Sequence, residues 1–245
     1  MNLQDTLNNK EILNNKENIT ILTKEIVDNF FNKNPYAKTF IIPDSVTKIN
    51  FYAFNDCKSL KEITIPDSVT EIGDCAFYGC LNLTEITIPE SVTKIGEYAF
   101  KNCKNLEKIT IPDSVTEIGN SAFDGCENLK GITIPDSVTK IGIDAFYGCE
   151  SLKDITIPKS VTEIGNGAFY GCTNLKEIIF QNPPSLNQMK LGENAFSGCD
   201  LENINITFLD NELDKDDITN SIGDTKKDEK ERAINKKSRK GGNYE

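Results

Sequence analysis

One 23-residue pattern recurs along most of this chain and constrains the fold more than any other feature. The segment from Lys130 to Leu152 reads KGITIPDSVTKIGIDAFYGCESL. Close copies begin at Lys61, Thr84, Glu107 and Lys153, and looser copies begin at Ala37 and Lys176. Self-similarity at a fixed period of this length is typical of solenoids, in which each repeat forms one coil and contacts its neighbours. We therefore expect one array of stacked coils.

Each copy contains the pattern of two short strands and a turn. Leu-x-x-Ile-x-Ile alternates apolar and polar positions, which predicts a strand with one buried face. A proline follows, as at Pro66, and predicts the end of the strand because proline cannot donate a ladder hydrogen bond. The serine two residues later is expected to bond a free backbone group of the turn. Val-Thr-x-Ile-Gly then predicts a second short strand, and Ala-Phe-x-Gly-Cys predicts a helical or 3₁₀ turn.

These motifs resemble a known family over the segment from Ala37 to Ile206. Leu-x-x-Ile-x-Ile is the strand signature of leucine-rich repeats, and Pro-x-Ser-Val-Thr-x-Ile-Gly-x-x-Ala-Phe-x-x-Cys is similar to the BspA-like class of that superfamily. The resemblance implies an α/β repeat solenoid: a curved stack with a parallel β-sheet on its concave side, and short second strands and helical turns on the other sides. Members of the class are commonly surface adhesins or protein-binding modules.

The repeats divide the chain into four segments. Residues 1–17 are rich in Asn and Lys and are predicted to be a loose leader. Residues 18–36 are predicted to be an N-terminal helical cap, or a degenerate repeat in which Ile26 aligns with Ile49. Residues 37–209 are predicted to form about seven coils, with an insertion of four residues within 181–190. Residues 210–245 are charged and poor in apolar side chains, which predicts a disordered tail.

Composition narrows the range of functions. The chain has 245 residues, a formal net charge of −11 and no histidine. The absence of histidine removes Ser-His-Asp and Cys-His catalysis and the commonest metal ligand, so neither an enzyme nor a cofactor or metal site is predicted. The acidic balance argues against nucleic acid as a partner.

The sequence shows neither the pattern of a membrane span nor that of a secretory signal peptide. No apolar run is long enough for a membrane span, and the N-terminal residues are too polar for a secretory signal peptide. These observations predict a cytoplasmic protein. A cell-surface location, or export by a route that leaves no such signal, is the alternative.

Function in a stack has to be read down columns, because equivalent residues of neighbouring coils lie about 4.8 Å apart. A column of cysteines is predicted to be buried free thiols, because that spacing is too long for disulfides and a straight column does not converge on a metal. A phenylalanine column is predicted to be core. The columns are Cys57, Cys80, Cys103, Cys126, Cys149, Cys172 and Cys199, and Phe54, Phe77, Phe100, Phe123, Phe146, Phe169 and Phe196. Cys75 lies in a variable column and is expected to be more exposed.

Two charged columns differ in their sign pattern. Lys48, Glu71, Lys94, Glu117, Lys140 and Glu163 alternate in sign, which predicts a register-setting column on a solvated face. A second column holds Asp44, Asp67, Glu90, Asp113 and Asp136, and is ended by Lys159. Turn chemistry and solubility explain this acidic column more simply than calcium, whose ligands would have to converge.

The outward positions of the first strands are the candidates for recognition. One column is uniform, as expected for a sheet surface, and comprises Thr64, Thr87, Thr110, Thr133 and Thr156. Its neighbour is variable, which is where specificity would lie, and comprises Glu62, Glu85, Lys108, Gly131, Asp154 and Glu177. We expect a non-enzymatic scaffold that binds a basic or mixed-charge protein on the concave face. The alternative is a cell-surface adhesin or host-interaction antigen.

Overall fold

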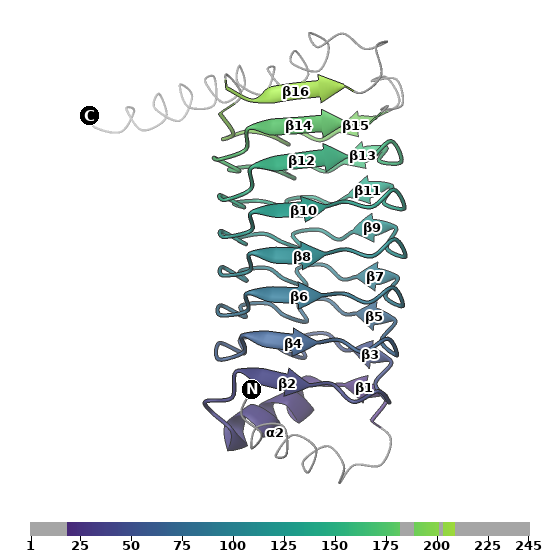
Figure 1. Ribbon diagram of the computed structural model, residues 1–245, viewed down its shortest axis with the longest axis vertical. Helices are drawn as coiled ribbons and strands as arrows, with labels where there is room; N and C mark the ends of the chain where they lie inside the picture. Colours follow the sequence, from purple (N-terminus) through teal and green to yellow (C-terminus); the bar gives the residue numbers. More distant parts are fainter. Residues whose placement is uncertain (1–18, 182–188, 201–202, 209–245) are drawn as a thin grey trace, which may run out of the picture.

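The computed structural model describes residues 19–181, 189–200 and 203–208, and shows a β-solenoid of about seven coils (Figure 1). The coils stack in one column, from helix α2 (Lys24–Lys33) at one end to strand β16 at the other. The predicted leucine-rich-repeat stack is therefore confirmed. Helical content is low, because α2 is the single helix of the described residues.

The first strands form two parallel sheets on one side of the stack. The five-stranded sheet contains β2 (Thr39–Ile41), β4 (Glu62–Thr64), β6 (Glu85–Thr87), β8 (Lys108–Thr110) and β10 (Gly131–Thr133). The three-stranded sheet contains β12 (Asp154–Ile157), β14 (Glu177–Phe180) and β16 (Asn205–Phe208). Strands pair at equivalent positions, as Ile63 does with Ile86, so the sequence register is confirmed. The hydrogen-bonded ladder is interrupted between β10 and β12, although the two strands remain in contact.

The second strands form a continuous parallel sheet along another side. It comprises β1 (Ile21–Leu22), β3 (Lys48–Ile49), β5 (Glu71–Ile72), β7 (Lys94–Ile95), β9 (Glu117–Ile118), β11 (Lys140–Ile141), β13 (Glu163–Ile164) and β15 (Lys190–Leu191). These two-residue strands confirm the second strand predicted from Val-Thr-x-Ile-Gly. Ile164 pairs with Leu191 rather than with a residue 23 positions later, which agrees with the predicted insertion of four residues. Residues 182–188 of that insertion lie outside the described residues.

The Ala-Phe-x-Gly-Cys segment is not helical, so the expected helical or 3₁₀ turn is wrong. Its backbone donors alternate between two kinds of acceptor. The Ala76 N–H donates to Gly73 three residues back at 3.2 Å, whereas the Phe77 N–H donates to Ala99 in the next coil at 2.7 Å. A 3₁₀-helix needs successive bonds to the third residue back. Here every second backbone N–H bonds the next coil instead. This side of the solenoid therefore consists of turns that are hydrogen-bonded from coil to coil.

Cys75 is buried at 8% exposure, which contradicts the expectation that it is more exposed. Its column has a left-handed backbone, with φ of 57° at Tyr52, 54° at Cys75 and 57° at Tyr98. The side chains of Tyr52 and Cys75 are hydrogen-bonded to each other. The two tyrosines are 46% and 38% exposed, so the shorter cysteine side chain lies below its longer neighbours and is covered.

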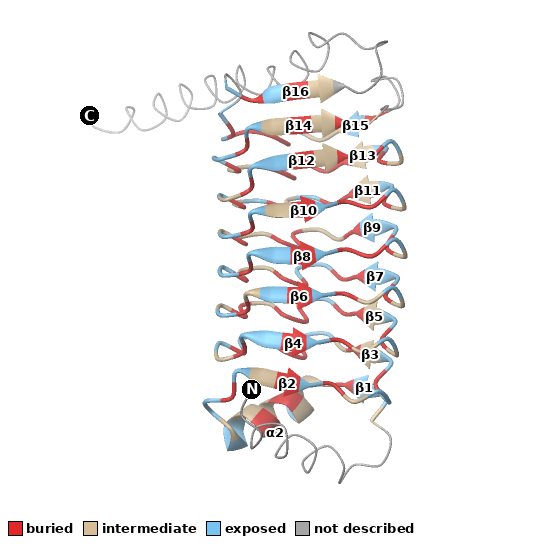
Figure 2. Cartoon of the chain, viewed as in Figure 1, coloured by how far each residue is buried: buried red, intermediate tan, exposed pale blue. Residues whose placement is uncertain are grey.

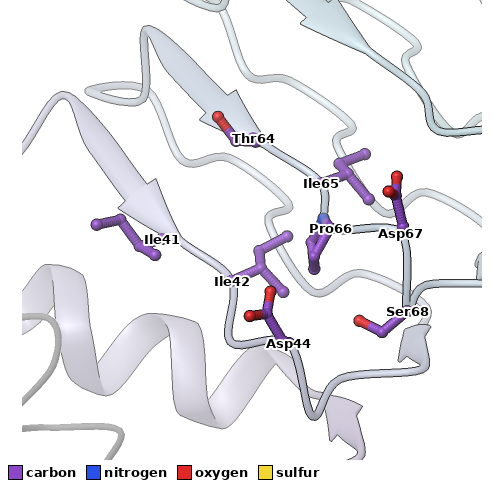
Figure 3. A pocket seen from close by; sticks show the side chains of 8 residues that line it. All are labelled: Ile41, Ile42, Asp44, Thr64, Ile65, Pro66, Asp67 and Ser68. Carbon is purple, nitrogen blue, oxygen red and sulfur yellow. The ribbon is translucent and has the colours of Figure 1, made fainter.

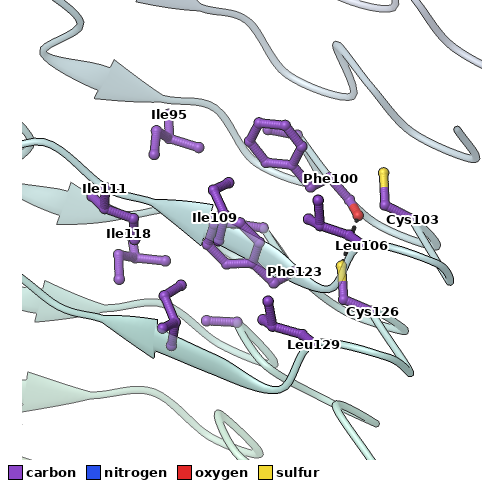
Figure 4. Packing of buried hydrophobic residues seen from close by; sticks show 14 of the residues in the cluster. Ile95, Phe100, Cys103, Leu106, Ile109, Ile111, Ile118, Phe123, Cys126 and Leu129 are labelled. Carbon is purple, nitrogen blue, oxygen red and sulfur yellow. Dashed lines mark hydrogen bonds between the residues drawn. The ribbon is translucent and has the colours of Figure 1, made fainter. Parts of the chain in front are cut away.

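Phenylalanine and cysteine columns form the centre of the stack, as predicted (Figure 4). Phe77 and Phe100 are fully buried and stack with centroids 5.2 Å apart and planes 3° apart. The Cys126 thiol donates a hydrogen bond to the Phe100 carbonyl of the preceding coil at 3.2 Å, and other cysteines of the column repeat this bond. All the cysteines are free, and burial raises the pKa of the Cys126 thiol. The thiols are therefore structural.

The serine after each proline bonds the preceding coil and not its own turn, which corrects the sequence expectation. The Ser91 hydroxyl donates to the Val69 carbonyl at 2.6 Å, and equivalent bonds are made by Ser114, Ser137 and Ser160. Ser68 differs, because its buried hydroxyl has no hydrogen-bond partner among the described residues. These bonds join neighbouring coils at the corner between the two sides that carry the strands.

The N-terminal segment combines both structures that the sequence left open. Strand β1 supplies a second strand to the eight-stranded sheet, and Leu22, not Ile26, lies in register with Ile49. Helix α2 then covers the open end of the stack, where Phe30 packs edge-on against Phe40 at 5.0 Å. The predicted alignment of Ile26 with Ile49 is therefore wrong, because the segment that contains helix α2 places Ile49 27 residues after Leu22, four more than one repeat. The predicted leader (1–17) and tail (210–245) lie outside the described residues.

Candidate functional site

The structure places all the predicted recognition residues on one exposed face, which we call the first-strand face. It consists of the outward side chains of the first strands, which are β2, β4, β6, β8, β10, β12, β14 and β16. Each of β4, β6 and β8 has two exposed outward residues around a buried isoleucine (Figure 2). The same pattern holds in β10, β12 and β14, where Gly131, Thr156 and Glu177 are half-buried. The two candidate columns therefore lie side by side.

The threonine column continues beyond the predicted residues, to the apolar Ile41 at one end and to Ile179 and then Thr207 at the other. Ile41 lies in register with Thr64 and is 38% exposed, and Ile179 lies in register with Thr156 and is half-buried. The variable column continues in the same way to Thr39 and Asn205. Extending the 23-residue register by one coil would have found Thr39, Ile41 and Ile179, whereas Asn205 lies 28 residues after its register partner Glu177.

Lysines border the first-strand face on the side where its strands begin. Exposed lysines immediately precede five of the strands, at Lys38, Lys61, Lys130, Lys153 and Lys176. The exposed acidic column lies on the opposite border, where the strands end, at Asp44, Asp67, Glu90, Asp113 and Asp136. The sequence analysis missed the lysine border because it followed only the alternating residues of the strands. Its charges give the face a positive side and a negative side.

Ion pairs neutralise some of the charges on this face and leave others free. Lys130 pairs with Glu107 at 2.6 Å, and Lys108 lies 3.9 Å from Glu85. All four side chains are more than half exposed, so each pair adds only about 0–1 kcal/mol to stability. Among the described residues, Asp154 forms neither an ion pair nor a side-chain hydrogen bond. Its carboxylate is therefore available to a partner.

Three hollows lie along the first-strand face. The first, of about 620 Å³, lies between the ends of β2 and β4, where Asp44 and the unpaired hydroxyl of Ser68 line it (Figure 3). The second, of about 390 Å³, lies over β4 and β6 and is lined by Glu62 and Glu85. The third, of about 500 Å³, lies over β8 and β10 and reaches Asp154. The face is therefore indented and rich in carboxylates.

The alternating column forms ion pairs on the second-strand sheet, as predicted. Lys48 bonds Glu71 at 2.9 Å, and Lys140 bonds Glu163 at 3.0 Å. The hydrogen bond to Glu163 raises the pKa of the Lys140 ammonium. Strand β15 continues the alternation, because Lys190 lies in register with Glu163. Charges of opposite sign cancel along this column, so it offers little field to a partner.

The described part of the chain contains no group of three or more Cys, Asp or Glu residues placed to hold a metal ion. It also contains no helix long and apolar enough to cross a membrane.

Parallel first strands with inward Leu-x-x-Ile-x-Ile side chains, repeated coil by coil, define a leucine-rich-repeat solenoid. The chain belongs to the BspA-type leucine-rich repeat family, because the family model for this region, with six copies, matches residues 24–142 and 93–221. The resemblance seen in the sequence is therefore confirmed. Proteins of this repeat family are generally scaffolds without enzymatic activity.

Solved bacterial structures show the same similarity. A leucine-rich repeat protein of T. pallidum is 33% identical with a TM-score of 0.63, over 67% of this chain and 77% of that chain. One from Bacteroides ovatus is 33% identical with a TM-score of 0.43, over 70% and 55%. A leucine-rich cell surface protein of Faecalibacterium prausnitzii is 28% identical with a TM-score of 0.39, over 74% and 62%. No curated protein is similar enough to add a relative.

Proposed function

We propose that this protein is a non-enzymatic scaffold that binds a partner protein on its first-strand face. The observation that carries the proposal is that two columns of outward side chains stay in register from coil to coil. A surface repeated in this way can contact an extended area of another protein. The predicted concavity of this face is part of the proposal, because curvature toward the sheet lets the stack surround a ligand of protein size.

The charges of the face favour a partner with basic or mixed charge. Glu62, Glu85, Asp154 and Glu177 make the variable column acidic, and Lys108 is the one cation among them. The lysine border and the acidic border then present opposite charges across the strands. Exposed charges of this kind set the association rate and its salt dependence more than the affinity. Threonine hydroxyls and methyl groups lie between the charges and would contact the partner directly.

Reversing charges on two different columns tests the location of binding. The recognition variant carries Glu62→Lys, Glu85→Lys and Glu177→Lys, and the control carries Glu71→Lys, Glu117→Lys and Glu163→Lys. A partner identified by cross-linking is titrated against both by surface plasmon resonance at several salt concentrations. The recognition variant should associate more slowly and with a flatter salt dependence, while the control should bind like the native protein. Loss of binding in the control alone would show that the first-strand face is only structural.

The location of the protein separates two forms of this proposal. Members of the BspA-like class are commonly surface adhesins, which favours a cell-surface adhesin or host-interaction antigen as the alternative to a cytoplasmic scaffold. Mild protease treatment of intact cells, followed by detection of released peptides, distinguishes the two. Peptides from residues 37–180 in the released fraction would establish the surface form. Recovery of the intact protein only from the lysate of treated cells would establish the internal form.

A further inference from the structure

Gly131 creates a gap in the variable column that neither the backbone nor packing requires. It is the first residue of β10 and is not among the residues with positive φ. A Cβ atom built on it would meet no other atom within 4 Å. Equivalent positions carry Glu62, Glu85, Lys108 and Asp154. A longer side chain would fit here, so the space that Gly131 leaves free is part of the hollow of about 500 Å³ over β8 and β10.

The hollow lies over the seam in the first strands. The ladder of hydrogen bonds is interrupted between β10 and β12, which are neighbours in the stack (Figure 1). Ile132 beside it is 9% exposed, the highest value among the buried hydrophobic residues of the described chain. Ile109 also lines the hollow, and Thr110 and Thr133 lie beside it. Ile109 and Ile132 are the buried middle residues of β8 and β10, so the exposed methyl groups beside the hollow are those of Thr110 and Thr133.

The charges around the hollow leave one carboxylate unneutralised. Lys130 is paired with Glu107 at 2.6 Å, and Lys108 lies near Glu85. Asp154 is exposed at the rim and has no ion-pair partner among the described residues. A guest with a cationic end and an apolar stem complements this arrangement, because the stem can lie over Gly131 and against the methyl groups of Thr110 and Thr133 while the cation reaches Asp154. Arginine suits the site because its guanidinium binds a carboxylate through two hydrogen bonds and is weakly hydrated.

We propose that the hollow at Gly131 is an anchor pocket for an arginine side chain of the partner protein, with Asp154 as the carboxylate that receives the guanidinium. This inference rests on the proposed function of the first-strand face. It makes Gly131 and Asp154 the specificity-determining residues of that face. Buried arginines at the centre of an interface commonly dominate its binding energy.

Three short peptides and two variants test the anchor pocket directly. The peptides are acetyl-Gly-Arg-Gly-amide, its lysine analogue and its citrulline analogue, which is similar in shape to arginine but uncharged. Each is titrated into the ¹⁵N-labelled full-length protein, and amide shifts are followed by NMR. The arginine peptide should shift amides of β8, β10 and β12 more strongly than the lysine peptide, and the citrulline peptide should shift them little. Equal effects of arginine and citrulline would overturn the role of Asp154.

The variants are Gly131→Thr, which fills the hollow, and Asp154→Asn, which removes the charge. Each should weaken binding of the arginine peptide about tenfold or more, as expected for an anchor residue. Glu163→Gln serves as the matched control, because it removes one carboxylate of the alternating column, away from the first-strand face. Thermal unfolding shows whether Gly131→Thr keeps the fold, and its melting temperature should not fall because the added atoms have free space. Unchanged peptide binding by a folded Gly131→Thr protein would overturn the proposal.

The same variants separate the pocket from the face when the whole partner is used. If the triple lysine variant of Glu62, Glu85 and Glu177 slows partner association while Gly131→Thr does not change binding, the face binds but the anchor proposal fails. If Gly131→Thr and Asp154→Asn weaken partner binding and Glu163→Gln does not, the anchor proposal holds. If no variant on the face affects binding, the proposed function fails together with the anchor.

Discussion

The glycine after each second strand packs against the backbone of the preceding coil, and this contact sets the spacing of the stack. A Cβ atom on Gly142 would lie 2.7 Å from the Asn120 nitrogen and 2.7 Å from the Gly119 carbonyl carbon. Both neighbours are backbone atoms, so they cannot rotate away as a flexible side chain could. We predict that Gly142→Ala forces two coils apart and destabilises the protein, whereas the same substitution at Gly131 does not.

The magnitudes follow from the two environments. Overpacking a tight site costs about 1–3 kcal/mol. A change of 1 kcal/mol moves the melting temperature of a protein of this size by about 2–4 °C, so Gly142→Ala should lower it by about 2–12 °C. Gly131→Ala meets no atom within 4 Å. It removes only the conformational freedom of glycine in a strand, which should stabilise the protein by about 0.5–1 kcal/mol. The two variants should therefore change stability in opposite directions.

Urea unfolding followed by circular dichroism checks this pair, with the native protein measured in the same series. Gly119→Ala is a replicate, because its Cβ would lie 2.9 Å from the Gly96 oxygen. Repeat stacks can lose two-state behaviour, so transition midpoints are compared alongside extrapolated free energies. A Gly142→Ala protein as stable as Gly131→Ala would refute the reasoning. It would mean that the stack expands at no cost and that this glycine has another role.

Two further predictions concern the columns. Titration of the unfolded, non-reduced protein with Ellman's reagent should detect close to all eight cysteines as free thiols. The folded protein should react far more slowly because its thiols are buried. Detection of two or fewer free thiols would contradict the structural role. Glu117→Lys puts like charges beside Lys94 and Lys140 and should lower the melting temperature slightly, and added salt should reduce the difference from the native protein; an unchanged melting temperature at low salt would show that the column does not affect stability.

The sequence predicts the fold well because the strongest signals are local and repeated. Alternation of Ile and Thr gives the inward and outward faces, and proline gives the strand ends, in the five coils that begin at Lys61, Thr84, Glu107, Lys130 and Lys153. The fixed period then brings equivalent residues into register without any further information, as the pairing of Ile63 with Ile86 shows. The recognition columns followed from the same rule, which is why all their residues lie on one face.

The errors arose where bonds between coils compete with local ones. Phe77 could have donated to its own turn, but its N–H bonds Ala99, and this choice removes the expected helical turn. Cys75 is buried because of the tyrosine in the neighbouring coil, which the position of Cys75 in its own repeat does not reveal. The hollow at Gly131 was also missed, because a glycine in a column of charges indicates only a missing side chain. Only the folded structure shows that Gly131 lies in a hollow that reaches the unpaired carboxylate of Asp154 and the interrupted ladder.

Nearly identical coils raise the question of what prevents one coil from being skipped when the chain folds. The phenylalanine and cysteine columns cannot prevent it, because each ring and thiol would stack equally well on the coil after next. The side-chain oxygens of Asp74 and Asn120 accept hydrogen bonds from the N–H groups of Glu97 and Ile143 in the next coil at 3.0 and 2.9 Å, and the coil after next would offer an equivalent N–H. The alternating column does distinguish the adjacent coil from the coil after next. Omitting the coil of Lys94 would place Glu71 beside Glu117, and every such skip exchanges opposite charges for like ones. We therefore expect this surface column to favour correct stacking, although its exposed ion pairs contribute little to the stability of the finished fold.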